Sequence, residues 1–253
     1  QTIRHHPNLN PAYSLQIGDP NTIAALTGIK TVADFRRRDI AIGGQGAPLT
    51  PAFHKYWFAQ FPGHYAIVNL GGFCNVTLLP EDRSKAIGFD TGPANAMLDA
   101  WYRKQCTDKN YPYDFNSEWA QTGSCQNAWL KLLLDNKYFA APVPKSTGHE
   151  TFNLKWLEQE IGQQIYTKPE NTQATLIELT ARSIAKHIPA HYKLVFCGGG
   201  ANNEYLCSRI LHAHGGAGTR SDEFGLGITK CPSYTGSVKS LQLSGIGRPY
   251  FSA

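Results

Sequence analysis

Residues 65–79 read YAIVNLGGFCNVTLL, and this stretch decides the fold. Apolar and β-branched side chains fill residues 65–70 and again residues 74–79, and the pair Gly71-Gly72 separates the two runs. A tight glycine turn between two strand-like runs predicts a β-hairpin. Residues 86–89, AIGF, predict a short third strand after it.

Helical spacing dominates the sequence after the hairpin. Apolar residues recur three or four positions apart in a helix that starts near Ala94. Three longer stretches repeat that spacing: 117–136, 152–165 and 171–188. Residues 193–197 then predict a strand that runs into three glycines, and residues 203–211 predict a further helix. This order of elements predicts an α/β protein, although periodicity alone allows many α/β folds.

The beginning and the end of the sequence predict less regular structure. Residues 1–20 are loop-rich, and Asp19-Pro20-Asn21 then signals a helix that Gly28 ends. Residues 31–38 predict a second short helix, and the glycine-rich residues 43–48 a loop. Residues 228–253 contain little apolar periodicity, and we expect no regular structure there.

Composition excludes several classes of protein. With 253 residues, of which 42% are hydrophobic, the chain can bury the core of one large domain or two small ones. The net charge is +5 but the basic residues are scattered, so we expect no nucleic-acid partner. No apolar run approaches the ~20 residues that span a membrane, so we expect no membrane partner. Six cysteines without a CxxC pair predict reduced thiols in a cytoplasmic protein.

Asn69, Asn75 and Thr77 are the polar residues of the predicted hairpin. The glycines between its strands, Gly71 and Gly72, let backbone N–H groups approach an anion closely, and the polar side chains add hydrogen-bonding groups. The segment is therefore a candidate ligand-binding turn. A plain hairpin with a glycine turn is the alternative.

Asp90 lies in a second candidate segment, GFDTGPAN at residues 88–95. The sequence predicts that this carboxylate lies at a strand end, just before a Gly-Pro turn and a helix, where α/β enzymes keep their chemistry. A carboxylate held there can act as a general base on water or a hydroxyl. The alternative is that Asp90 merely caps the following helix.

Three weaker candidates remain. The glycines at 198–200 suit close approach of a ligand to the backbone, although the sequence contains neither a GxxxxGK[ST] loop nor a GxGxxG motif. Arg36 or Asp39 can hold a sugar or its acidic substituent, or can form a surface ion pair. His187 and His191 have helical spacing, but a proline lies between them, so we expect no metal site formed by the protein alone.

Seven segments together resemble the anhydro-N-acetylmuramic acid kinase family. The segments are QTIRHHP (1–7), DFRRRDIAIGGQGAPLTPAFH (34–54), NLGGFCNVTLLP (69–80), GFDTGPANAMLDAW (88–101), KSTGHETFN (145–153), NTQATLIELTARSIA (171–185) and CGGGANNEYL (197–206). They are long and specific, and they follow one another in the family's order. The resemblance covers residues 1 to about 227, which is nearly the whole chain.

The resemblance implies an actin-like, hexokinase-like ATPase fold, with two lobes and a nucleotide cleft between them. On that basis residues 1–63 are a remnant of the first lobe, residues 64–227 form the second lobe, and residues 228–253 are an irregular tail. ATP, Mg²⁺ and 1,6-anhydro-N-acetylmuramic acid are the implied ligands. The implied product is N-acetylmuramic acid 6-phosphate, made with simultaneous opening of the anhydro ring in cell-wall recycling. The chain can be a monomer or form a homodimer, and the resemblance does not decide between the two.

The resemblance also implies roles for residues of this chain. Asp90 would activate the water that attacks the anomeric carbon, while O6 of the sugar takes the γ-phosphate. The implied nucleotide-binding residues are Asn69, Gly71, Gly72, Asn75, Gly198, Gly199, Gly200 and Asn202. The implied residues of the sugar side are Thr2, His5, Arg36, Thr91 and Gly92.

The sequence departs from the family pattern in three places. Family members begin with a segment of the type MSGTSxDGxD that grips the phosphates, and without it we expect an incomplete first lobe. The family usually has Arg where His149 stands, and residues 228–253 do not resemble the acidic, alanine-rich helix of the family. The alternative to an active kinase is therefore a catalytically inactive, truncated remnant that at most binds sugar or nucleotide. A different actin-like kinase or phosphatase is a third hypothesis.

Overall fold

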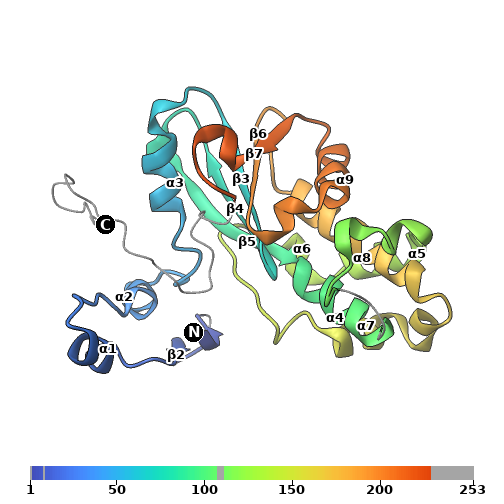
Figure 1. Cartoon of the computed structure of the whole chain (residues 1–253), viewed down its shortest axis with the longest axis horizontal. Coiled ribbons are helices and arrows are strands. Elements are labelled where there is room, and N and C mark those ends of the chain that lie inside the picture. Colours follow the sequence, from blue (N-terminus) through green and yellow to red (C-terminus); the bar gives the residue numbers. More distant parts are fainter. Residues whose placement is uncertain (1, 8, 107–110, 229–253) are drawn as a thin grey trace.

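The predicted hairpin forms the centre of a five-stranded sheet in the computed structural model, which describes residues 2–7, 9–106 and 111–228. Strands β3 (Tyr65–Leu70) and β4 (Phe73–Leu79) pair antiparallel, with Tyr65 opposite Leu79. Strand β5 (Ile87–Pro93) adds antiparallel to β4. Strands β6 (Lys193–Cys197) and β7 (Gly218–Arg220) add parallel on the other side, which gives the order β5-β4-β3-β6-β7 (Figure 1). The predicted α/β class is confirmed.

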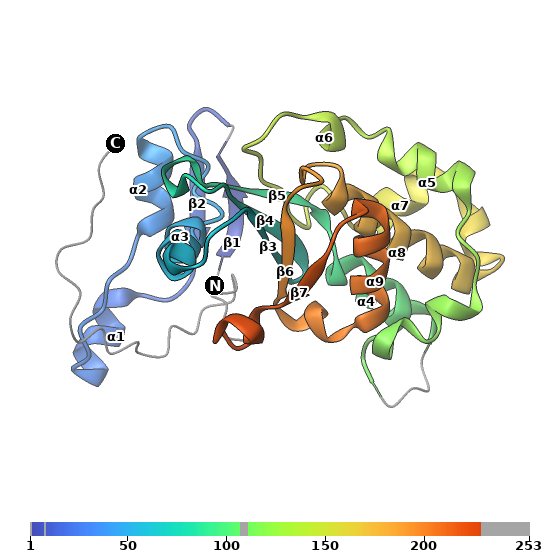
Figure 2. The same cartoon turned by 90° about the horizontal axis from the view of Figure 1, so that it is seen from above.

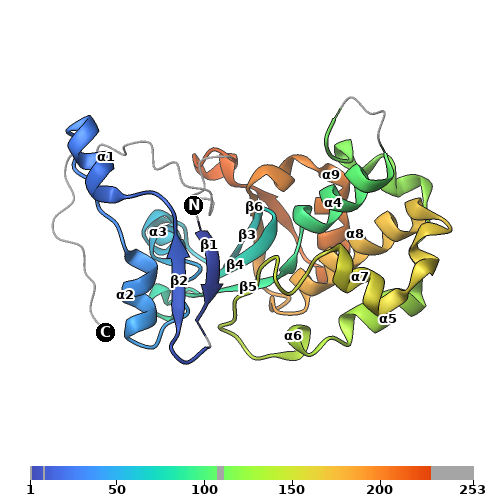
Figure 3. The ribbon, with the colours of Figure 1, turned by 90° about the horizontal axis from the view of Figure 1, so that it is seen from below.

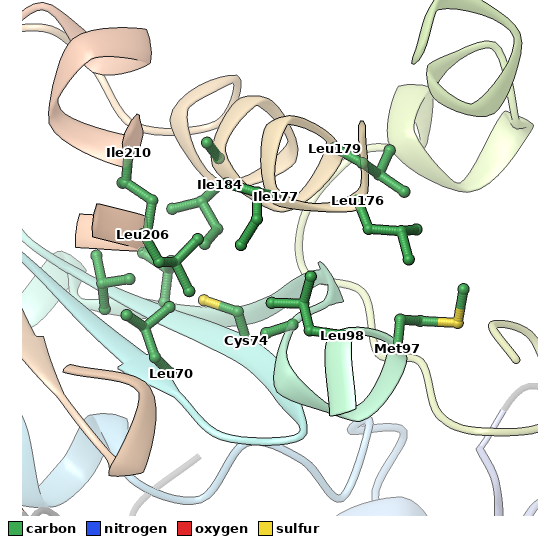
Figure 4. Close-up of a cluster of buried hydrophobic side chains, with 14 of the residues drawn as sticks. Leu70, Cys74, Met97, Leu98, Leu176, Ile177, Leu179, Ile184, Leu206 and Ile210 are labelled. Carbon is green, nitrogen blue, oxygen red and sulfur yellow. The ribbon is translucent and has the colours of Figure 1, made fainter. Parts of the chain in front are cut away.

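Most of the helices pack together on one face of this sheet (Figures 1 and 2). They are α4 (Asn95–Gln105), α5 (Asn127–Leu134), α6 (Lys137–Ala140), α7 (Leu154–Ile161), α8 (Pro169–Ala185) and α9 (Glu204–His214). Helix α8 is the most buried because apolar residues line it at helical spacing. In Figure 4 its Ile177 and Ile184 approach Cys74 of the sheet, and Met97 and Leu98 of α4 complete this layer.

The opposite face of the sheet carries a smaller apolar cluster. Helix α3 (Pro51–Trp57) and a 3-10 turn at Phe58–Gln60 place Phe58 against Ile67, Leu79 and Val195. Side chains of a strand alternate between its two faces, so Asn69 shares this second face with Ile67. Residues 51–60 therefore pack on the five-stranded sheet, although the boundary predicted at residue 63 assigns them to the first lobe.

Residues 2–16 form a separate two-stranded sheet, which corrects the prediction of a loop-rich start. Strand β1 (Thr2–His6) pairs antiparallel with β2 (Tyr13–Gln16), and β2 packs against α2 (Phe35–Ala41), as Figure 3 shows. Local sequence conceals these strands because five and four residues of mixed polarity carry no clean alternation. Their only strand partners among the described residues are each other.

Helix α1 (Pro20–Thr27) forms as predicted. The side chain of Asp19 accepts hydrogen bonds from the backbone N–H groups of Asn21 and Thr22, and Gly28 ends the helix with a φ of 66°. Helices α1 and α2 bury none of their residues. Several large apolar side chains of this region are exposed: Ile23, Leu26, Ile29, Val32, Phe35 and Ile42.

The prediction of one helix over 117–136 is wrong in its first half. Two 3-10 turns, at Phe115–Ser117 and Ala120–Thr122, precede α5, which starts only at Asn127. The carboxylate of Asp114 accepts the N–H groups of Trp119 and Ala120, and this local bonding competes with helix formation. Gly123 also interrupts the predicted helix, at the point where its backbone packs against the backbone of Glu170.

Smaller differences have equally local causes. Gly162, with a φ of 80°, splits the predicted helix 152–165 into α7 and a 3-10 turn at Gln163–Tyr166. Helix α2 starts at Phe35 rather than at residue 31, and the sequence did not predict β7. The expectation for residues 228–253 lies outside the described residues except for Ile228. None of the described helices is both long and apolar enough to cross a membrane.

Candidate active site

Asn69, Asn75 and Asp90 form a row across three neighbouring strands. Asn69 on β3 is paired with Asn75 on β4, and Asn75 is paired with Asp90 on β5. Residues directly opposite each other in an antiparallel pair place their side chains side by side on one face. All three residues are buried, with exposed fractions of 2%, 6% and 6%. The fold therefore brings together two amides and a carboxyl group from three separate sequence motifs.

A β-bulge places Asp90 in this row. Strand β5 continues to Pro93, so Asp90 lies inside the strand, and the prediction that it ends the strand is wrong. The pairing shifts between Cys74, opposite Gly92, and Asn75, opposite Asp90, so that Thr91 is the extra residue. Such a bulge changes the direction of the strand and of its side chains. Residue Ala94 caps α4, which excludes the role of Asp90 as the cap of that helix.

Thr91 and Gly92 shape the bulge. The Thr91 hydroxyl is fully buried and donates to the carbonyl of Cys74 at 3.3 Å. Gly92 has a φ of 149°, and a Cβ there would lie 2.8 Å from the ring of Phe139. Both residues, predicted on the sugar side, thus have clear contacts within the protein.

Helix α6 and the segment that follows it hold Asp90 by three hydrogen bonds. The N–H of Asp90 donates to the carbonyl of Lys145 at 2.8 Å, and the carbonyl of Asp90 accepts from the hydroxyl of Tyr138 in α6 at 2.8 Å. The N–H of Thr147 donates to Oδ2 of Asp90 at 3.1 Å. These bonds fix the main chain and one carboxyl oxygen, which is the positioning that a general base requires.

The surroundings of Asp90 raise its pKa to about 7. Burial is the largest cause, because it disfavours the charged carboxylate, and the charge of Glu150 adds to it. The N–H of Thr147 and the charge of Arg36 act in the opposite direction. A carboxyl group with such a pKa can accept a proton near neutral pH and can release it again.

A cavity of about 180 Å³ reaches Thr147, the residue whose N–H bonds the carboxyl group of Asp90. It lies between the turn after β1 and the segment after Lys145, and its lining residues are His5, His6, Pro7, Leu9, Ser146, Thr147, Glu150 and Thr151. Thr147 joins the cavity to Asp90, since its N–H bonds the carboxyl group. Sequence reasoning missed 146–151 as site residues, although the segment KSTGHETFN was among those that carry the resemblance.

His5 and Arg36 both lie close enough to influence this region. Nδ1 of His5 is 3.0 Å from the hydroxyl of Ser14, and its pKa is lowered by burial and then by the charge of Arg36. Arg36 donates from Nη1 to the carbonyl of Gly46 at 2.7 Å. Asp39 accepts from the N–H of the same glycine at 2.7 Å, so its carboxylate holds the glycine loop. Thr2 is placed only as part of β1.

The glycine loop after β6 packs directly on Asn69. A Cβ on Gly198 would lie 2.4 Å from Oδ1 of Asn69, and one on Gly200 would lie 2.7 Å from Nδ2 of Asn95. Only glycine allows these approaches. A Cβ on Gly199 would meet no atom within 4 Å, so that position borders open space. The exposed Asn202 donates from Nδ2 to the carbonyl of Gly199 at 3.3 Å.

Hydrogen bonds connect the turn of the central hairpin to the start of α4. The carbonyls of Gly71 and Gly72 accept the N–H groups of Asn95 and Ala96, at 3.2 and 2.9 Å. These N–H groups of the helix are therefore already bonded. Asn95, which sequence reasoning did not select, also donates from its side chain to the carbonyl of Leu70 at 3.2 Å.

Among the described residues, three buried oxygen atoms of this site have no hydrogen-bond partner. They are Oδ1 of Asn69, Oδ1 of Asn75 and Oγ1 of Thr147. A buried acceptor without a donor is costly, and native structures usually provide one through a ligand, ion or water. Within the described residues, no group of three or more His, Cys, Asp or Glu side chains could hold a metal ion.

Known proteins that are similar to this chain indicate its family. The family model described as anhydro-N-acetylmuramic acid kinase matches residues 1–231. The curated anhydro-N-acetylmuramic acid kinase of Shewanella sp. (strain ANA-3) is 50% identical over 214 residues, which cover 83% of this chain and 57% of that protein. That of Shewanella oneidensis is 49% identical over 213 residues, with the same coverage. The chain thus spans 57% of the length of the curated relatives that it matches.

Among solved structures, the activator of 2-hydroxyisocaproyl-CoA dehydratase from Clostridium difficile with bound ADPNP is similar at a TM-score of 0.43 and 15% identity. The match covers 68% of this chain and 60% of that one. The match to the family model extends over more than nine-tenths of the sequence and includes every residue of the candidate site. The chain therefore belongs to the anhydro-N-acetylmuramic acid kinase family.

Proposed function

We propose that this chain contributes to the ATP-dependent phosphorylation of 1,6-anhydro-N-acetylmuramic acid, with cleavage of the anhydro ring and formation of N-acetylmuramic acid 6-phosphate. The observation that carries the proposal is the buried Asp90, held by three hydrogen bonds at the edge of a cavity and with a pKa of about 7. Membership of the kinase family supports it.

In the proposed reaction the carboxylate of Asp90 accepts a proton from a water molecule as the water oxygen attacks the anomeric carbon. The bond between that carbon and O6 breaks, and O6 takes the γ-phosphoryl group of ATP, so that ADP leaves. The raised pKa makes Asp90 a stronger base than an exposed carboxylate, while it is still ionised at slightly alkaline pH. The bond from Thr147 keeps one carboxyl oxygen fixed during the transfer.

The cavity beside Asp90 is the proposed sugar site. His5 of β1 and Glu150 of the segment after Lys145 both line it. Arg36 is near enough to alter the pKa of both His5 and Asp90. A guanidinium group suits a carboxylate such as the lactyl group of the sugar. The cavity of about 180 Å³ encloses only part of a sugar of that size.

The glycine loops and the two amides form the proposed nucleotide side. Gly199 borders open space beside Asn69, which gives a phosphate access to backbone N–H groups. The unpartnered oxygens of Asn69 and Asn75 are hard ligands of the kind that Mg²⁺ prefers, so these residues fit an ion that accompanies the phosphates. Such an ion would neutralise charge that develops on the transferred phosphoryl group.

The test is a coupled assay of ADP release with ATP, Mg²⁺ and 1,6-anhydro-N-acetylmuramic acid. Asp90→Asn should lower kcat at least ~100-fold, since it removes the base. Asp99→Asn is the matched control, because burial also raises the pKa of Asp99 on α4, to about 6, and this residue lies outside the site. Its turnover should equal that of the unchanged protein.

Calorimetric titrations with the sugar and with ATP separate the alternatives. Turnover that depends on Asp90 supports the kinase. Binding of sugar or nucleotide without any turnover supports the inactive binding protein instead. Turnover that survives in Asp90→Asn overturns the assignment of the base.

A further inference from the structure

A second cavity, of about 350 Å³, lies where α8, α9 and the segment before α5 meet. Its lining residues are Gly123, Cys125, Asn127, Ala174, Glu178, Arg182, Tyr205 and Arg209. It shares no residue with the cavity beside Asp90 and has about twice its volume. The candidate kinase site does not use it.

The positive charge of this second cavity exceeds its negative charge. Arg182 and Arg209 both approach the carboxylate of Glu178, whose side chain is only 10% exposed. Arg209 donates from Nε to Oε1, and Nε of Arg182 lies 3.7 Å from Oε2. Two guanidinium groups thus face one carboxylate, which leaves one positive charge in excess. Burial and the charge of Glu178 raise the pKa of Cys125, so this thiol adds no negative charge at neutral pH.

The wall of this second cavity is built before any ligand arrives. The N–H of Ser124 donates to the side chain of Asn171 at 2.8 Å, and that of Gln126 to the hydroxyl of Thr175 at 3.0 Å. These bonds fix the segment before α5 to helix α8. On α8 the lining residues Ala174, Glu178 and Arg182 follow at intervals of four, so they lie on one helix face. A fixed wall reduces the entropy that a ligand must lose on binding.

We propose that this second cavity is a binding site for a small oxyanion, a compound with a phosphate or carboxylate group. Both arginines contact Glu178 through Nε, and a guanidinium fork also carries terminal N–H donors that suit an oxyanion. Asn127 and Tyr205 add polar groups to the lining, which can bond the remainder of the ligand. Glu178 orients the two arginines and weakens the attraction for the anion.

Isothermal titration with inorganic phosphate and, separately, with malonate tests the proposal at constant ionic strength. The unchanged protein should bind at least one of the two saturably, and the preferred probe identifies the ligand as a phosphate or a carboxylate. Arg182→Gln should weaken binding about tenfold, since it removes a charged donor. Glu178→Gln should tighten it about fivefold, because it removes a negative charge at a distance of ~4 Å.

Arg37→Gln is the matched control, because Arg37 also forms an exposed ion pair, with Asp34, far from α8 in the sequence. Its affinity for the probes should be unchanged, and because the titration measures binding alone, the test does not depend on kinase activity. A purely structural Arg–Glu–Arg cluster would not bind more tightly in Glu178→Gln. Absence of saturable binding in that variant, or equal affinity in Arg182→Gln, overturns the proposal.

Discussion

Asn75 on β4 lies directly opposite Asp90 on β5, and the one-residue bulge at Thr91 begins at that pair. Without the extra residue the pairing of Cys74 with Gly92 would bring Thr91, not Asp90, opposite Asn75. The bulge therefore decides which side chain of the GFDTGP motif joins Asn69 and Asn75 on one face of the sheet. This single irregularity of register gives the site its carboxyl group.

The stability of the protein should fall as pH rises through the range in which Asp90 ionises. Its folded pKa of about 7 lies above its ordinary value of 3.8, so between these values the folded state binds more protons than the unfolded state. The free energy of unfolding should thus lose up to about 1.4 kcal/mol per pH unit from this group. Asp90→Asn should remove that slope. Urea denaturation at pH 4 to 8 measures both proteins, and identical slopes would contradict the raised pKa.

Lys145 should produce the opposite pH dependence at alkaline pH. The residue is 7% exposed, and burial lowers the pKa of its amino group from 10.5 to about 8. Between pH 8 and 10.5 the unfolded state therefore binds more protons, and stability from this group should rise with pH. Lys145→Met should flatten the rise, as measured by thermal unfolding. A rise of equal size in the variant would assign it to other groups.

Gly199 and Gly200 allow a matched pair of substitutions in the glycine loop. Gly200→Ala should cost about 1–3 kcal/mol of stability, because its Cβ would lie within 2.8 Å of Leu70 and of the Asn95 side chain. Gly199→Ala should change stability by less than ~0.5 kcal/mol, since nothing lies within 4 Å. Chemical denaturation compares the two variants. Equal losses would mean that the loop does not pack as described.

Asn69→Ala should separate nucleotide binding from stability. Its buried Oδ1 has no hydrogen-bond partner in the described part of the chain, so removing it should cost little stability while weakening the binding of ATP with Mg²⁺ about tenfold. Asn203→Ala is the reverse case, because this side chain caps α9 by accepting the N–H of Leu206 at 3.0 Å. It should cost about 1 kcal/mol and leave affinity unchanged. Unfolding curves measure the stability of both variants, and calorimetry measures their affinity for ATP with Mg²⁺. An unchanged affinity in Asn69→Ala would show that Asn69 does not belong to the nucleotide site.

Much of the fold was predictable because its signals are local. The hairpin of residues 65–79, the cap of α1 by Asp19 and the strand before the three glycines all form as expected. The mixed five-stranded sheet and the helices packed on it confirm the α/β class that the order of elements predicted. The β1–β2 sheet and the break of the helix at 117–136 were not predictable. Both depend on bonds whose partners the local apolar pattern does not reveal.

The sequence by itself determined the family, the central hairpin and the three polar residues Asn69, Asn75 and Asp90, since long motifs and glycine turns are local properties of a chain. Only the tertiary structure decided that these residues form one row. Register and bulge depend on strand pairing across the sheet. Burial among distant segments likewise decided that the pKa of Asp90 is about 7, because desolvation is a property of the packed site.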